Sequence, residues 1–482
     1  MPGVTMDTFK RFTKNSISLF VAKVFSIMFS IVFGIYSART LGDAGYGQYG
    51  FIVVLLGYFV VTSEFGLDYL IVRDVSTRKH QTNEYLSTSI FFKLVTVTLS
   101  VLLMAGSTLI LGRPDIFWIG LLAAISLFPL ALYTSFDNCF RAHERMIYIA
   151  IVEIIYMALR SGLGILVLVK GFHLQALFAA FVGVECVRLL LIALFYHVKI
   201  APISFTFQKD LFRHFWKEAV PLASWEMLGV LYVRVEVLIL MVLLGDAAVG
   251  WYKVSMNVTD LISTVSMIAM SAVLPVMSNY FHESPERLLG LYRMVLRYIV
   301  IIMLPVGMAI TLFADDLIVW MFGTEYASSV VILQILIWSA TLSFILALLG
   351  TVILVIDKFR LAAKLSTINT SFKILLSIVL IREFGYIGAP IACLAANAFS
   401  LALFIPVVSR TLGHTGIDLS LVRSVAVSIV LIFLGWIISN YSGSPLLTIA
   451  AGFSLYLFMV FKTKMVTDQE RKAVRQIFNW GA

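Results

Sequence analysis

Ionisable side chains lie inside the long apolar stretches of this chain, where a charge is costly and usually has a function. Fifteen such residues are present: Lys23, Glu64, Asp68, Lys93, Asp137, Glu153, Arg160, Glu185, Arg188, Glu226, Arg234, Glu236, Lys253, Asp260 and Lys373. All but the last precede residue 261. This distribution predicts a polar cavity lined mainly by the N-terminal half of the chain.

Four deeply placed cations are the candidate substrate-binding residues of this cavity: Lys23, Arg160, Arg188 and Arg234. A guanidinium matches phosphate oxygens with two parallel bonds, and a lysine supplies a point charge. We therefore expect contacts to an anionic substrate. For Arg188 a local pair with Glu185, three residues earlier on the same helix face, is an equally good interpretation.

Five further residues are candidates for lining the cavity or for ion coupling: Glu64, Asp68, Lys253, Asp260 and Lys373. Carboxylates bind protons and hard cations, so coupling to H⁺ or Na⁺ is an expectation. Asp68 lies near the end of its apolar stretch. At such a depth an interfacial ion pair or anchor is favoured over a role in transport.

Patterns typical of enzymes and metal sites are missing from the sequence. There is no P-loop, and no serine, histidine or metal-ligand constellation. The cysteines Cys139, Cys186 and Cys393 are odd in number and scattered, which argues against disulfides and metal binding. We expect no catalytic residues, no bound metal and no cofactor.

The elements that must position these residues are membrane helices. The 482-residue chain is 60% hydrophobic and 13% charged, with a mean hydropathy of +0.97, whereas soluble domains carry about 25% charged residues. Continuous apolar runs of about 20 residues must be helical to cross a bilayer. We predict an all-α integral membrane protein of about 14 transmembrane helices. The expected spans are residues 15–38, 47–72, 86–112, 115–139, 146–169, 174–198, 217–244, 249–279, 293–314, 327–356, 359–381, 386–409, 420–439 and 446–462.

Lysines and arginines concentrate in the loops on the side of the two termini, and such loops are normally cytoplasmic. This placement predicts a multi-pass protein of the cell (inner) membrane with both termini in the cytoplasm. It also explains the net charge of +9 without a nucleic-acid partner. The first apolar run is too long for a cleavable signal peptide, so an uncleaved anchor is expected.

A short segment is repeated along the chain. Residues 41–49 read LGDAGYGQY and residues 244–252 read LGDAAVGWY. The two copies lie six spans apart, which predicts parallel repeats of six helices each. The expected divisions are a first lobe (1–200), a second lobe (218–410), and spans thirteen and fourteen with a basic tail (411–482).

The residues between the lobes, 201–217, form the longest basic linker. Leu211 and Phe215 share one helical face, away from Lys209 and Arg213. Such a cytoplasmic amphipathic segment is expected to lie flat on an anionic membrane surface, with an ordinary solvated connector as the alternative.

Several motifs resemble one family. Residues 38–42 read ARTLG and are followed by YGQY at 46–49. The supporting motifs, in order, are FGL at 65–67, RD at 73–74, VGWY at 249–252, LP at 274–275, FGTEY at 322–326 and GYIGAP at 385–390. Together they are similar to the polysaccharide/oligosaccharide flippase family of the multidrug/oligosaccharidyl-lipid/polysaccharide exporter superfamily.

The resemblance implies a V-shaped transporter that works by alternating access. Its implied substrate is a polyprenyl-linked oligosaccharide diphosphate, carried from the cytoplasmic to the outer leaflet for polysaccharide biosynthesis and export. The implied partners are this lipid-linked oligosaccharide, membrane lipid and glycan-assembly enzymes.

Two alternatives stay open. An ion-coupled multidrug or solute antiporter of the same superfamily is disfavoured by the fourteen expected spans and the motifs. A membrane-embedded sugar polymerase or glycosyltransferase would need a large outer loop with acidic residues. The longest outer connection, near 314–326, holds only Asp315, Asp316 and Glu325.

Overall fold

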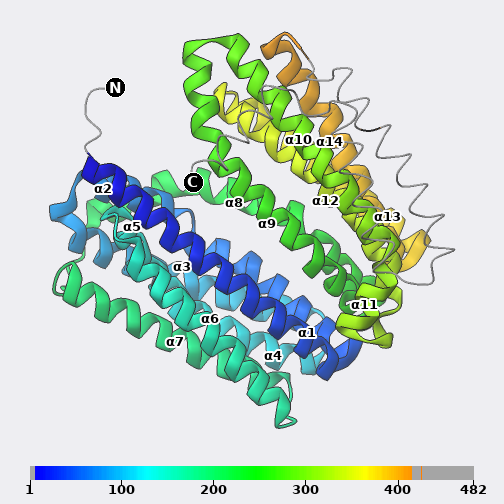
Figure 1. Ribbon diagram of the computed structural model, residues 1–482. Helices are drawn as coiled ribbons and strands as arrows, with labels where there is room; N and C mark the ends of the chain where they lie inside the picture. Colours follow the sequence, from blue (N-terminus) through cyan, green and yellow to red (C-terminus); the bar gives the residue numbers. More distant parts are fainter. Residues whose placement is uncertain (1–5, 415–424, 426–482) are drawn as a thin grey trace, which may run out of the picture. The chain divides into compact units, whose positions relative to one another are not determined.

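The computed structural model of the protein describes residues 6–414 and residue 425 (Figure 1). Within these residues the chain is helical, with three short 3-10 helices and no strand. The order is α1 (Met6–Glu64), α2 (Leu67–Thr77), η1 (Lys79–Gln81), α3 (Thr82–Ile110), α4 (Pro114–Ile125), α5 (Leu127–Ala142), α6 (Met146–Val169), α7 (Leu174–Lys199), α8 (Lys209–Leu244), α9 (Asp246–Glu283), α10 (Pro285–Leu312), α11 (Ala314–Phe322), η2 (Thr324–Tyr326), α12 (Ser328–Val355), α13 (Phe359–Phe384), η3 (Gly385–Ile387) and α14 (Gly388–Leu412).

Ten helical segments of the described chain are long and apolar enough to cross a membrane. Two of them, Ile17–Glu64 and Arg360–Leu412, each overlap two of the predicted spans. The joins are glycines at positive φ, Gly42 (φ 67°) and Gly385 (φ 61°), where the chain bends without a loop. The first twelve predicted spans therefore coincide with apolar helical segments, and the all-α, multi-pass architecture is confirmed. Predicted spans thirteen and fourteen lie outside the described residues, apart from residue 425.

The chain forms two compact units, Met1–Lys253 and Val254–Ala482, here called unit 1 and unit 2. Unit 1 contains α1 to α8 and the first residues of α9. Within it α8, which was predicted to open the second lobe, packs against α1, α2 and α3. The division into units therefore lies after Lys253 and not at residues 201–217.

The interlobe linker differs from the flat interfacial helix that its pattern suggested. Residues 209–217 are the first turns of α8. Leu211 and Phe215 are buried in a hydrophobic cluster with Leu67 and Leu70 of α2. The apolar face packs on the protein because α2 and α3 offer it a hydrophobic surface, so this face is unavailable to lipid.

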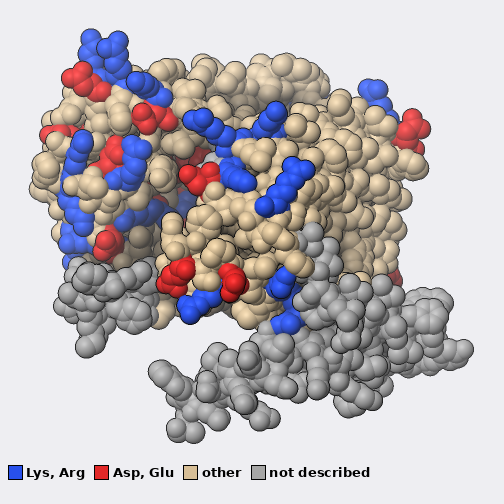
Figure 2. Space-filling model, turned by 90° about the horizontal axis from the view of Figure 1, so that it is seen from above, with Lys and Arg blue, Asp and Glu red and all other residues tan. Residues whose placement is uncertain are grey.

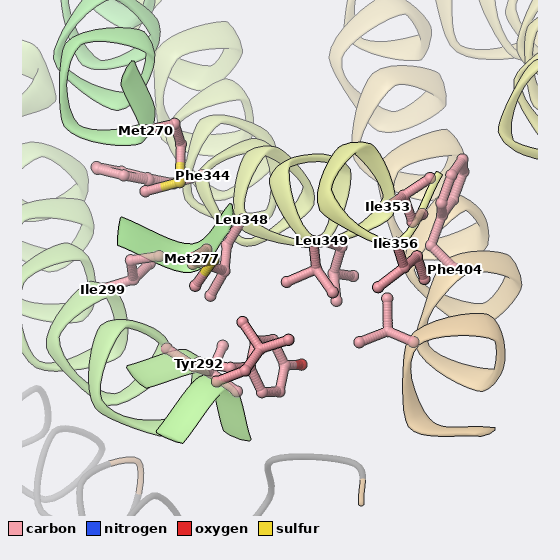
Figure 3. Packing of buried hydrophobic residues seen from close by; sticks show 14 of the residues in the cluster. Met270, Met277, Tyr292, Ile299, Phe344, Leu348, Leu349, Ile353, Ile356 and Phe404 are labelled. Atoms are coloured by element: carbon pink, nitrogen blue, oxygen red, sulfur yellow. The ribbon is translucent and has the colours of Figure 1, made fainter. Parts of the chain in front are cut away.

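The core of unit 2 is built from α9, α10, α12 and α14. Figure 3 shows Met270 of α9 beside Phe344 of α12, and Leu348 and Leu349 one turn further along. Leu348 is completely buried.

Seen from above, the molecule carries Lys and Arg side chains in groups with Asp and Glu, separated by uncharged surface (Figure 2).

The break between α1 and α2 contains two residues in left-handed conformation. Phe65 has φ 51° and Gly66 has φ 71°. A Cβ atom at Gly66 would lie 2.7 Å from Leu222 Cβ and 2.9 Å from Ala223 N of α8. Glycine is thus required at this point both by the backbone and by the close approach of α8.

Gly66→Ala is expected to destabilise the protein by about 2–4 kcal/mol, because a left-handed alanine and an overpacked contact act together. Gly57→Ala is the matched control on α1, since a Cβ there meets nothing within 4 Å. The control is expected to be neutral or to stabilise slightly. Thermal unfolding of the purified variants in detergent measures both, and equal melting temperatures would contradict the account.

Candidate functional site

Arg188 of α7 lies at the meeting point of three membrane helices. Its guanidinium is 3.8 Å from the ring centroid of Tyr133 (α5) and 4.0 Å from that of Tyr156 (α6). Nη2 is 2.6 Å from a carboxylate oxygen of Glu153, and Nη1 is 3.4 Å from one of Glu185. The side chain is 11% exposed. Two carboxylates and two aromatic faces therefore already surround this buried cation.

Arg160 of α6 joins the same group. Its Nη1 donates a 2.7 Å hydrogen bond to the Tyr156 hydroxyl, and its guanidinium is 4.2 Å from the ring centroid of Phe181. The Tyr156 hydroxyl donates to Glu185, whose nearer oxygen is 3.8 Å from Arg160 Nη1. Both arginines lie at least nine residues from either end of their helices.

We name this group the central cluster: Tyr133, Glu153, Tyr156, Arg160, Glu185 and Arg188. It holds two cations and two carboxylates, so its formal charge is balanced. The pair predicted from the spacing of Glu185 and Arg188 is present, and Glu153 adds a second partner. The tyrosines were missed because apolar helices contain many aromatic residues and nothing in the spacing distinguishes these two.

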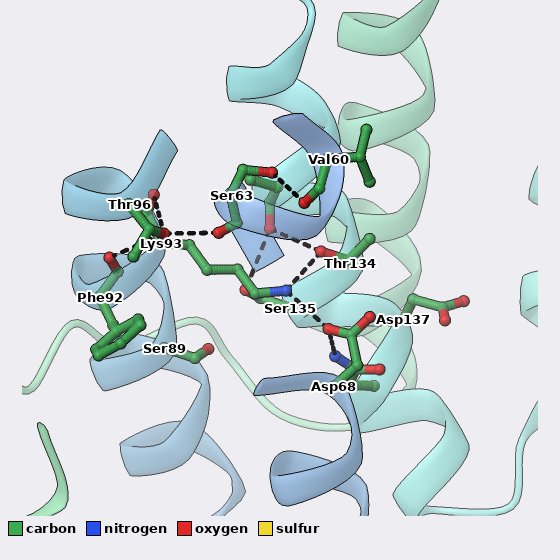
Figure 4. Close-up of polar contacts among 12 residues, drawn as sticks. Val60, Ser63, Asp68, Ser89, Phe92, Lys93, Thr96, Thr134, Ser135 and Asp137 are labelled. Atoms are coloured by element: carbon green, nitrogen blue, oxygen red, sulfur yellow. Dashed lines mark hydrogen bonds and ion pairs between the residues drawn. The ribbon is translucent and has the colours of Figure 1, made fainter. Parts of the chain in front are cut away.

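A second polar group lies where α1 to α3 approach α5 (Figure 4). Lys93 of α3 is completely buried, and its Nζ is 2.9 Å from Asp68 Oδ1 and 2.6 Å from Thr134 Oγ1. Asn138 donates a 2.7 Å hydrogen bond to the same Asp68 oxygen. Asp68 is thus held by an ion pair, as its position near a span end suggested.

Further carboxylates make this second group acidic. Asp137 accepts a 2.5 Å bond from Arg141 and a 3.3 Å bond from the Tyr133 hydroxyl, which connects it to the central cluster. Glu64 lies within electrostatic range of Lys93 and of three other acids: Asp68, Asp137 and Glu226. The acidic group, defined as Glu64, Asp68, Lys93, Asp137, Arg141 and Glu226, holds four carboxylates and two cations. Binding a proton or another cation would reduce this excess.

The other candidate residues lie elsewhere. Lys23 on α1 is exposed, and no hydrogen bond or ion pair joins it to the described part of the chain. Arg234 on α8 is partly exposed and has an interaction partner. Lys253 is buried beside Gly50 in unit 1. Asp260 on α9 and Lys373 on α13 belong to unit 2.

The two copies of the repeated segment meet in unit 1. Gln48 donates a 2.9 Å hydrogen bond to Asp246, and Trp251 donates a 3.0 Å hydrogen bond to Asp43. Positions 48 and 251 correspond in the repeat, as do 43 and 246, so the contact is reciprocal. We name it the turn pair. A Cβ at Gly47 or at its counterpart Gly250 would collide with a backbone carbonyl of the other copy. This contact explains why both copies retain that glycine.

Arg113, between α3 and α4, reinforces the turn pair. It contacts both Asp246 oxygens at 2.7 and 2.8 Å and Asp115 at 2.6 Å. Hydrogen bonds to these two carboxylates raise the pKa of Arg113 further above its usual range. Arg113 was not among the residues predicted for the site, because its partner Asp246 lies 133 residues away in the sequence.

Comparisons with known proteins identify the family. A model of the family described as polysaccharide biosynthesis protein matches residues 12–281, more than half of the chain. The chain belongs to this family. Among curated proteins it is 24% identical over 393 residues to the probable low-salt glycan biosynthesis flippase Agl15 of Haloferax volcanii, covering 81% of this chain and 82% of that protein.

Solved structures of other proteins have the same fold as this chain. The lipid II flippase MurJ, in an inward closed conformation, aligns with a TM-score of 0.76 and 13% identity, covering 94% of this chain and 99% of that one. An inward-facing multidrug resistance MATE transporter of the MOP superfamily aligns with a TM-score of 0.64 and 16% identity, covering 80% and 94%. The predicted family and transporter fold are confirmed. These relatives are flippases and transporters, in agreement with the expectation that the chain is no enzyme.

Proposed function

We propose that this protein is a flippase that moves a polyprenyl-linked oligosaccharide diphosphate from the cytoplasmic to the outer leaflet by alternating access. The observation that carries the proposal is the central cluster, which holds two arginines deep in the helices of unit 1. Buried charges in membrane helices are costly and mark substrate or ion pathways. Family membership and the flippase named among its relatives support the same activity.

The balanced charge of the central cluster suggests how the substrate binds. With no substrate, Glu153 and Glu185 neutralise Arg188 and Arg160. A diphosphate then competes with these carboxylates for the guanidinium groups, which bind phosphate oxygens in two-point contacts. Lys23 is exposed and has no such carboxylate partner in the described part of the chain, and it supplies further positive charge during entry.

Polar groups of the same site suit the sugar part of the substrate. The Tyr156 hydroxyl and the carboxylates offer hydrogen bonds to sugar hydroxyls. The buried Phe181 ring lies against the Arg160 guanidinium and holds it in place. A drug-type antiporter has less need of paired arginines, because many of its substrates are cations.

The turn pair supports the alternating-access part of the proposal. It brings two segments from corresponding positions of the repeat together on the predicted outer side, and it is closed by reciprocal hydrogen bonds and Arg113. In our proposal these turns separate when the substrate leaves for the outer leaflet. The orientation, with both termini in the cytoplasm of an inner-membrane protein, is part of the same proposal.

Deletion of the gene in its own host tests this function. We expect the lipid-linked oligosaccharide to accumulate and the surface glycan to disappear, because synthesis continues while export stops. Increased drug sensitivity without any lipid-linked intermediate would instead establish the antiporter alternative.

We infer further that the acidic group couples transport to H⁺ or Na⁺. Its four carboxylates exceed its two cations, and Glu64 borders the break between α1 and α2. Glu64→Gln is expected to make export insensitive to collapse of the ion gradient, measured with ionophores selective for each ion. Asp315→Asn, on the short helix α11, is the control. Unchanged gradient dependence in Glu64→Gln would contradict the assignment.

A further inference from the structure

Two buried polar atoms on α13 in unit 2 have no hydrogen-bond partner among the residues that the structure describes. They are Oδ1 of Asn369, a residue that is 3% exposed, and Oγ of Ser377, a residue that is completely buried. Buried polar groups in folded proteins are nearly always hydrogen-bonded. Within a membrane the lipid supplies no substitute. These two atoms therefore carry a cost that the surrounding helices do not compensate.

Comparable polar side chains nearby do form hydrogen bonds, so this region is not simply poor in hydrogen-bonding groups. Asn397 on α14 is also 3% exposed, yet its amide donates hydrogen bonds to Ser339 Oγ at 2.8 Å and Ser343 Oγ at 2.9 Å. Thr370, next to Asn369, bonds to the Ser366 carbonyl at 2.8 Å. The contrast points to a requirement at Asn369 and Ser377 other than packing.

The two atoms flank a buried lysine. Asn369, Lys373 and Ser377 are spaced four residues apart, so they lie on one face of α13 over about 12 Å. Lys373 is 2% exposed and lies at least eleven residues from either end of Phe359–Phe384. From that depth a lysine side chain does not reach the membrane surface.

We propose that Asn369, Lys373 and Ser377 form a binding site for hydroxyl groups of the transported glycan. The inference rests on the proposed flippase function and adds a sugar subsite in unit 2 to the central cluster of unit 1. An amide oxygen accepts a hydrogen bond, an ammonium group donates one, and a serine hydroxyl does either. Neighbouring hydroxyls along a sugar chain offer the complementary groups at similar spacing.

Water has the same hydroxyl chemistry, so the experiment must separate a hydrated track from a sugar site. The first measurement compares Asn369→Leu and Ser377→Ala with the control Thr370→Val. Removing an unpartnered buried polar group should leave the melting temperature unchanged or raised, whereas Thr370→Val loses a formed bond and should lower it. In the same variants we expect export to fall about 5- to 10-fold for the first two and to stay normal for the control.

Export at the wild-type level in Asn369→Leu and Ser377→Ala would overturn the proposal. If Asn369→Leu does not accumulate in the membrane, Ser377→Ala and the second measurement decide. Loss of export in Thr370→Val as well would also overturn it, because the effect would then be a general response of α13 to substitution.

The second measurement labels Ser377→Cys with methanethiosulfonate ethylammonium, in a background carrying Cys186→Ser because Cys186 is exposed. Membranes come from cells that make the native lipid-linked glycan and from cells lacking its first sugar transferase. Labelling that is slower when the glycan is present supports the sugar site. Equal labelling identifies a water track, and no labelling shows that neither ligand reaches the residue; either result overturns the proposal.

The two proposals fail in different ways. If the deletion strain accumulates no lipid-linked glycan, the flippase function is wrong. If the glycan accumulates in the deletion strain but Ser377→Ala exports it normally, only the α13 site is wrong.

Discussion

Arg188→Ala is expected to reduce export of the lipid-linked glycan about 10- to 100-fold, because the substrate loses a charge-assisted contact in a low-dielectric site. The same change leaves Glu153 and Glu185 without their 2.6 Å and 3.4 Å partner. Unpaired buried charges cost about 3–5 kcal/mol. Melting temperature and membrane abundance must therefore be measured together with glycan export.

A neutralised variant separates binding from folding. Replacing Glu153 and Arg188 together by glutamine removes one carboxylate with its cation and keeps Glu185 as the partner of Arg160, so stability is expected to recover relative to Arg188→Ala. Export should stay low, since the Arg188 guanidinium that would bind the phosphate is still missing. Recovery of export in this double glutamine variant would show that Arg188 serves only as a structural counter-ion. Arg287→Ala, which breaks an exposed pair with Glu283 at 3.5 Å, is the surface control and should change neither property.

Cross-linking the turn pair is expected to stop export completely. The backbones of the two turns approach closely, since a Cβ at Gly47 would lie 1.8 Å from Asp246 O, so cysteines at positions 48 and 246 are expected to form a disulfide under oxidising conditions. Alternating access requires these segments to separate in each cycle, and a covalent link prevents this. Export by the double-cysteine variant is measured before oxidation, after oxidation and after reduction.

The reduced form provides the baseline, because Asp246→Cys alone removes both contacts to Arg113. Gln48→Cys by itself is the control and should be unaffected by oxidation. Cross-linked protein that exports the glycan as fast as its reduced form would show that the turns stay together during transport.

Much of the fold follows from local properties of the sequence. Twenty-residue apolar runs had to be helices in a bilayer, and the repeated LGDA turns marked equivalent positions at residues 41–44 and 244–247. The predicted spans end at residue 38 and restart at 47, and end at 381 and restart at 386, whereas the structure joins the helices there through bends at Gly42 and Gly385. For Leu211 and Phe215 the amphipathic pattern was real. The pattern alone did not reveal whether lipid or protein covers that face.

The candidate site was only partly predictable, for a different reason. Buried charges stand out in an apolar sequence, so Arg160 and Arg188 were found. Part of their contacts come from other helices, as when Glu153 of α6 reaches Arg188 of α7 from 35 residues away. In the turn pair, Arg113 reaches Asp246 from 133 residues away. Such pairs depend on tertiary packing and leave no local spacing. That Asn369 Oδ1 and Ser377 Oγ have no hydrogen-bond partner among the described residues can likewise be found only from the positions of all neighbouring side chains.

Reconstitution of the purified protein in proteoliposomes tests the central claim most directly. The vesicles contain the lipid-linked glycan extracted from the deletion strain, and a membrane-impermeant reagent oxidises only the sugars on the outer surface. We predict that vesicles with the wild-type protein expose nearly all of the glycan over time, while vesicles with the Glu153→Gln/Arg188→Gln variant expose only the share already in the outer leaflet. Equal oxidation in wild-type vesicles and protein-free vesicles would contradict it.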